Sequence, residues 1–103
     1  RQRRCLVPAA HYFEWEKRGK DRIKYAIRPG GAAVMYMAGI YRLENDMPVF
    51  TILTREPAAA ISFIHNRMPV ILPKEAAGDW LNIRYDAGDV LAGAVQDVEC
   101  WLA

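Results

Sequence analysis

The sequence is poor in the residues from which metal sites and disulfide frameworks are built. Its 103 residues include two cysteines and two histidines, and none of these lie at the CxxC or HxxxH spacings of metal ligands. There is also no secretory signal and no apolar run close to the roughly 18 residues that a membrane span requires. We therefore expect no cofactor, no metal and no membrane partner, and a reducing, cytoplasmic setting.

Net charge is also small, which excludes an argument for nucleic-acid binding from the total alone. The formal charge is only +2, so the distribution of charge has to carry any such argument. Basic side chains crowd one stretch, at Lys17, Arg18, Lys20, Arg22 and Lys24. A solvated hairpin tip would show the same pattern, and both interpretations stay open at this point.

The remaining composition is that of one folded domain. With 52% hydrophobic and 25% charged residues, the chain is close to an average soluble protein of about one domain. Strand-like patterns dominate, and helical signals follow Pro57 and Pro73. We predict an α+β fold, mainly of antiparallel strands forming a partial barrel, with short peripheral helices. The expected strands span residues 4–8, 11–17, 22–28, 33–42, 49–54, 70–72 and 98–102.

The most apolar of these stretches, residues 33–42, has no polar side and is expected to be the central strand. Gly39 interrupts it, which indicates a bulge or a close approach of neighbouring backbone.

Glu14 is the first candidate for chemistry, because its carboxylate lies between Phe13 and Trp15 in a stretch that is otherwise typical of a buried strand. Partial desolvation would disfavour the charged form and raise its pKa, and such acids are candidates for proton transfer. The period of two along a strand, however, places Glu14 on the face opposite to Phe13 and Trp15.

His65 is the second candidate, since it lies in a loop-like segment beside Asn66 and Arg67. A single histidine at such a junction is more often structural. A desolvated acid, a histidine that titrates near neutrality and an arginine able to hold phosphate together favour a site. We predict that Glu14 and His65, although far apart in sequence, face the same cleft within direct or one-water hydrogen-bonding reach.

These residues lie in motifs that resemble a known family. Residues 5–9 (CLVPA) with 13–15 (FEW), and residues 64–72 (IHNRMPVIL), are similar to the two signature blocks of the SRAP domain, the SOS response-associated peptidase family. Residues 50–54 also fit its pattern. The resemblance spans nearly all of the chain.

The resemblance implies a protein that recognises abasic sites in single-stranded DNA. An N-terminal cysteine, exposed by removal of the initiator methionine, would condense with the ring-opened sugar aldehyde and close to a thiazolidine crosslink. By the resemblance, Glu14 would orient or deprotonate the cysteine amine and His65 would assist opening of the sugar ring. Thr54 and Arg67 would lie by the DNA backbone, and Trp15 would stack or wedge near unpaired bases.

Some of these assignments have alternatives. Trp15 could equally be a core tryptophan that shares a face with Phe13. Arg22, Lys24 and Arg28, on the basic face of the second hairpin strand, are further candidates for DNA contact.

The chain also departs from the family pattern. The Met-Cys start, the asparagine-containing block and the closing segment at the C-terminus are not among its residues, and Cys5 lies in an expected strand without a free α-amine. We therefore expect residues 1–103 to be a SRAP-like domain without its N-terminal catalytic segment and its C-terminal closing segment, unable to crosslink DNA alone. Its oligomeric state is left open, and a neighbouring chain could cover the termini.

Two other functions stay open from the sequence. A cysteine-dependent peptidase would use Glu14 and His65 to serve a thiol nucleophile, and self-removal of the leading methionine would already meet that description. A non-catalytic module would bind single-stranded DNA through its basic groove alone.

Overall fold

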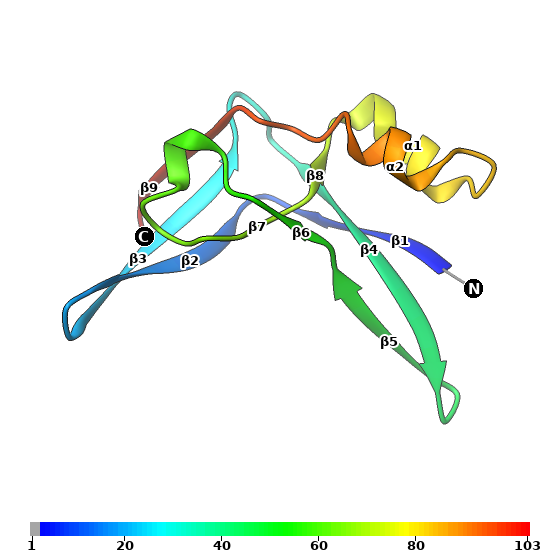
Figure 1. Cartoon of the computed structure of the whole chain (residues 1–103), viewed down its shortest axis with the longest axis horizontal. Helices are drawn as coiled ribbons and strands as arrows, with labels where there is room; N and C mark the ends of the chain where they lie inside the picture. Colours follow the sequence, from blue (N-terminus) through cyan, green and yellow to red (C-terminus); the bar gives the residue numbers. More distant parts are fainter. Residues whose placement is uncertain (1–2) are drawn as a thin grey trace.

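The computed structural model describes residues 3–103 (Figure 1). Every strand pair within these residues is antiparallel. The elements, in chain order, are β1 (Arg3–Ala9), β2 (Tyr12–Arg18), β3 (Asp21–Pro29), β4 (Met35–Glu44), β5 (Met47–Ile52), β6 (Thr54–Arg55), the 3₁₀ helix η1 (Ala59–Ile61), β7 (Met68–Pro69), β8 (Ile71–Leu72), α1 (Lys74–Leu81), α2 (Ala87–Leu91) and β9 (Val98–Leu102).

The strands form three sheets. One has the order β1-β4-β5 with β8 also paired to β4, the second is β2-β3-β9, and the third is β6-β7. The β2-β3 and β4-β5 hairpins extend to opposite sides of the molecule (Figure 1). The predicted α+β class with mainly antiparallel strands and short helices is confirmed, while the sheets do not close into a barrel.

Strand β4 is central in its sheet, as its apolar sequence predicts. It pairs with β1 along one edge and with β5 and β8 along the other. A Cβ built on Gly39 would lie 3.0 Å from Cys5 Sγ and 3.0 Å from the Thr51 carbonyl oxygen. Such distances are too short for a side chain, so the predicted close approach of neighbouring backbone at Gly39 is confirmed.

The hairpin turns follow from residues that tolerate the left-handed conformation. Gly19 has φ of 63° between β2 and β3, and Asn45 and Asp46 have φ of 51° and 63° between β4 and β5. Two consecutive positive φ values are the signature of the two-residue turn whose twist matches a β-hairpin. These turns set the strand register, and with it the face on which each side chain lies.

Two hydrophobic cores lie on either side of this framework. The first core consists of Ile27, Met35, Met37, Ala58, Ile61, Ile64, Met68, Ile71 and Val98. The second core, under the helices, consists of Ala38, Val70, Leu72, Trp80, Val90 and Ala94. Neither α-helix within residues 3–103 is long and apolar enough to cross a membrane.

Candidate functional site

Strand β2 presents two different faces. Tyr12, Glu14 and Glu16 are half-buried, whereas the residues between them are exposed, with Trp15 at 44%. The prediction that Phe13 and Trp15 desolvate Glu14 is therefore wrong, because both rings lie on the opposite face. The core alternative for Trp15 is also wrong, because its side chain is exposed.

The Glu14 carboxylate makes one hydrogen bond within the described residues, accepting from the Trp15 backbone N–H at 3.2 Å. This hydrogen bond between neighbouring residues leaves lone pairs on both carboxylate oxygens, and each oxygen can still accept a proton or a further hydrogen bond.

His65 lies in the loop between η1 and β7. Ile64 before it and Met68 after it belong to the first core, which holds the exposed residues between them at the surface. The Arg67 backbone N–H donates to His65 Nδ1 at 3.2 Å. Since Nδ1 is the acceptor, the proton of the neutral imidazole lies on Nε2, which remains free to donate.

Glu14 and His65 line the same two cavities. One, of about 350 Å³, is also lined by Trp15, Lys17 and Arg22, together with Ile64 and Asn66. The other, of about 240 Å³, also includes Tyr12, Met37, Ile52, Thr54, Arg67, Met68 and Pro69 in its lining. The prediction that Glu14 and His65 face one cleft is confirmed. No hydrogen bond joins them directly within residues 3–103, and reach through one water stays a prediction.

Arg67 and Thr54 meet at the second of these cavities. Arg67 Nε donates to Thr54 Oγ1 at 3.3 Å, and its Nη2 donates to the Thr54 carbonyl oxygen at 2.9 Å. Both residues are exposed, and β6 and β7 bring them together by pairing Thr54 with Pro69. The guanidinium is thus held in one orientation beside His65, with donors left for an anion.

Tyr12 is the remaining polar group of the cavity of about 240 Å³, and the sequence did not predict it. Its hydroxyl is buried and has no hydrogen-bond partner within the described residues. Burial, followed by the nearby charges of Glu14 and Cys100, raises the pKa of the Tyr12 hydroxyl well above its usual value. Strand alternation does place Tyr12 on the face of Glu14, but no sequence signal shows that the hydroxyl would lack a partner.

Neither cysteine lines these two cavities. Cys5 and Cys100 are free thiols, half-buried in β1 and β9 respectively. Burial raises the pKa of the Cys5 thiol, which disfavours the nucleophilic thiolate.

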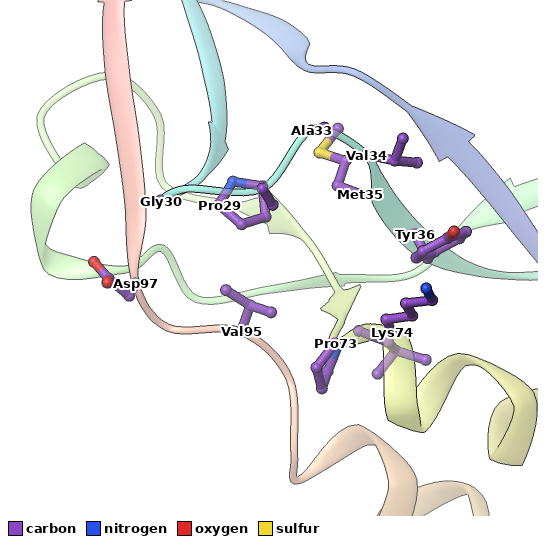
Figure 2. A pocket seen from close by; sticks show the side chains of 12 residues that line it. Pro29, Gly30, Ala33, Val34, Met35, Tyr36, Pro73, Lys74, Val95 and Asp97 are labelled. Atoms are coloured by element: carbon purple, nitrogen blue, oxygen red, sulfur yellow. The ribbon is translucent and has the colours of Figure 1, made fainter.

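A further cavity of about 540 Å³ is larger, but most of the residues that line it are apolar. It lies between the β3-β4 connection, the start of α1 and the segment before β9. In Figure 2, Pro29, Val95 and Pro73 surround it, with Asp97 and Lys74 on opposite sides. None of the sequence-predicted site residues lines it, and we take the smaller cavities at Glu14 and His65 as the functional site.

Comparisons with known proteins agree on one family. A family model described as SOS response associated peptidase (SRAP) matches residues 1–100. The chain is 34% identical over 95 residues to the abasic site processing protein YoaM of Bacillus subtilis, covering 86% of this chain and 42% of that protein. It is 30% identical over 105 residues to the abasic site processing protein HMCES of Gallus gallus, covering 78% of this chain and 31% of that protein.

Solved structures share the fold. A crystal structure of a protein from Bacteroides thetaiotaomicron superposes with a TM-score of 0.84 at 28% identity, covering 98% of this chain and 49% of that one. A protein from Bordetella bronchiseptica, at 21% identity and a TM-score of 0.77, shows the same fold. The chain spans less than half the length of these curated relatives.

Proposed function

The chain belongs to the SOS response associated peptidase (SRAP) family, and on that basis we propose that it supplies the acid–base and DNA-contacting part of a protein that captures abasic sites in single-stranded DNA. The observation that carries the proposal is the cleft shared by Glu14 and His65, with Arg67 and Thr54 at its side. Relatives that match most of this chain are named abasic site processing proteins.

The proposed reaction uses both members of the Glu14–His65 pair. An abasic sugar reacts through its open aldehyde form: as the ring C1–O bond breaks, the C1 hydroxyl loses its proton, a water carries that proton to the ring oxygen, and His65 Nε2–H donates a hydrogen bond to the same oxygen. An α-amine then adds to the aldehyde carbon, Glu14 accepts the amine proton, and loss of water gives an imine. The thiol of the same cysteine adds to the imine carbon, so that amine, thiol and aldehyde together yield a thiazolidine and one water.

The proposed nucleophile is an N-terminal cysteine outside residues 1–103. Cys5 and Cys100 both lie within strands and carry peptide bonds on their α-nitrogens, so neither can close such a ring. The same cysteine, with Glu14 and His65, would serve in removal of an initiator methionine.

The DNA contacts follow from the groups around the cleft. The Arg67 guanidinium and the Thr54 hydroxyl would bond phosphate oxygens flanking the abasic sugar. Trp15 is exposed at the rim of the cavity and would stack on an adjacent unpaired base.

Adduct formation tests the proposal. The protein that carries this chain behind an N-terminal cysteine should form a heat-stable adduct with abasic single-stranded DNA on a denaturing gel. Glu14→Gln should slow the adduct by about 100-fold or more, because a positioned general base contributes at least that factor. Glu75→Gln, an exposed acid on α1, is the matched control and should react at the wild-type rate.

Other outcomes would assign a different function. An adduct that survives replacement of the N-terminal cysteine by alanine would contradict the proposal. Cleavage of unrelated peptides that is lost in His65→Ala would favour a cysteine-dependent peptidase. Adduct-free binding with a steep salt dependence would favour a non-catalytic single-strand binding module.

A further inference from the structure

The outer face of the β2-β3-β9 sheet carries exposed aromatic rings that the proposed chemistry does not use. Phe13 is 43% exposed and Trp101 is 40% exposed. They lie on either side of Ala26, which pairs with Phe13 across one strand boundary and with Trp101 across the other. Ala26 is only 2% exposed, so the two rings stand above a small residue and cover it. His11 packs edge-on against both rings, at centroid distances of 4.9 and 5.9 Å.

Cations are interleaved with these rings. Lys24 Nζ lies 4.1 Å from the centroid of Phe13 and 5.7 Å from that of Trp15. The Arg28 guanidinium lies 5.0 Å from the centroid of Trp101. We call the surface formed by His11, Phe13, Trp15, Lys24, Arg28 and Trp101 the aromatic face.

The charge of this surface is unbalanced. Arg28 pairs with Glu99 at 3.2 Å, but Lys17, Arg22 and Lys24 form no salt bridge within residues 3–103. A surface of free cations and exposed rings complements a polyanion whose units carry flat π-systems. A paired duplex would present phosphates to the cations but could not bring its bases onto the rings.

The aromatic face is continuous with the proposed site. Trp15 belongs to it and also lines the cavity of Glu14 and His65, together with Lys17 and Arg22. In Figure 1, β2 and β3 run side by side from the hairpin tip toward the C-terminal β9. Because β2 is at the edge of its sheet, a strand that leaves the cavity can pass around this edge beside Trp15, and it then meets Lys24, Phe13 and Trp101 on the other face.

We propose that the aromatic face binds single-stranded nucleic acid, stacking unpaired bases on Trp15, Phe13 and Trp101 while Lys24 and its neighbouring cations contact phosphates. The proposal rests on the proposed function and extends it, because it gives the path of the strand beyond the abasic nucleotide. Stacking on rings is tolerant of base identity, so this surface would hold flanking DNA of any sequence.

Binding of an undamaged oligonucleotide tests the face without any adduct chemistry. Fluorescence anisotropy with a mixed-sequence single strand of about 16 nucleotides should show binding at least about fivefold weaker for Trp101→Ala and for Phe13→Ala, since one stacked base is lost in each. Trp101→Phe keeps a ring and should bind nearly as wild type. Phe50→Ala, which removes a ring that is 58% exposed on β5, is the matched control and should have no effect.

Two further measurements separate stacking from charge. Trp80 is buried, so quenching of tryptophan fluorescence by the oligonucleotide should come from Trp15 and Trp101 and fall in Trp101→Phe. Lys24→Met should reduce the slope of log K against log salt by about 0.7, the value for one phosphate of a single strand. Lys74→Met, at the other cavity, should leave the slope unchanged.

The outcomes distinguish this inference from the proposed function. Wild-type affinity in both Trp101→Ala and Phe13→Ala, or no binding of undamaged single strands at all, would overturn the aromatic face. The adduct experiment with Glu14→Gln is independent of that result. Loss of the adduct in Glu14→Gln together with wild-type binding in both Trp101→Ala and Phe13→Ala would leave the function in place and remove only the aromatic face.

Discussion

The two hydrophobic cores differ in how they contact the candidate functional site. The first core contains Ile64 and Met68, which flank the loop of His65 and Arg67 and hold these exposed residues against β2. The second core supports the helices and adjoins the site through Val70, which follows Pro69 of the cavity lining. Equal burial therefore does not mean an equal role, because the first core lies on both sides of the loop that carries His65 and Arg67.

Trp80 dominates the second core. It is 1% exposed, and its indole N–H donates to the backbone oxygens of Cys5 at 3.0 Å and Gly39 at 3.3 Å. The Arg4 guanidinium lies 4.8 Å from the ring centroid. One side chain thus fastens α1 to both β1 and β4.

The largest expected effect is a loss of stability when Trp80, which joins α1 to β1 and β4, is removed. Trp80→Ala should lower the free energy of unfolding by about 3–5 kcal/mol, because it leaves a cavity and two backbone oxygens that lose a donor. Urea denaturation followed by circular dichroism measures the change. Leu81→Ala, which removes an exposed side chain of the same helix, should cost little, and an equal loss of stability in both variants would contradict the anchoring role of Trp80.

The next effect separates the two cores by function. Met68→Ala in the first core and Leu72→Ala in the second, both fully buried, should each cost about 2–5 kcal/mol in unfolding free energy. Only Met68→Ala should also weaken binding of abasic single-stranded DNA by the folded protein, since it loosens the loop of His65. Anisotropy titrations at a temperature where both variants are folded provide the measurement. An equal loss of binding in both would show that the cores do not differ in this way.

The smallest effect concerns Tyr12, which packs against the first core. Tyr12→Phe should be neutral or stabilise the protein by up to about 1 kcal/mol, because it removes a buried hydroxyl without a partner. The raised pKa of Tyr12 also predicts how stability depends on pH, because the folded protein holds the hydroxyl proton more tightly than the unfolded chain does. Its contribution to the free energy of unfolding is fully present below the usual pKa of about 10 and falls as pH rises above it. Thermal melts between pH 8 and about 11 should show a shallower alkaline loss in Tyr12→Phe. An unchanged profile would contradict the assignment.

Local signals predicted much of the fold. The helix after Pro73 appears as α1, and the expected strand over 33–42 appears as β4. The expected strand over 49–54 ends instead at Ile52, because Leu53 bonds to the backbone of Ala38 and of Val70 and passes the chain to another sheet. Such a transfer depends on partners remote in sequence, which no local pattern reveals.

Part of the candidate site could also be predicted from the sequence. Glu14 and His65 were identified by residue type, setting and family resemblance. The hydrogen bond that assigns the His65 tautomer and the partnerless hydroxyl of Tyr12 required the structure, because both depend on how side chains meet in space.

The pattern of residues along the chain predicts which side chains alternate in each strand and where the chain turns, and therefore that Glu14 and Trp15 point to opposite faces. These properties are local, since they follow from the two-residue period of a strand and from the conformations open to glycine and asparagine. The folded chain was needed to show that His65 shares a cavity with Glu14, that Arg67 is held by Thr54, and that Trp101 lies across Ala26 from Phe13. Those contacts arise from strand register and core packing between distant segments, and many sequences with the same local pattern could pair differently.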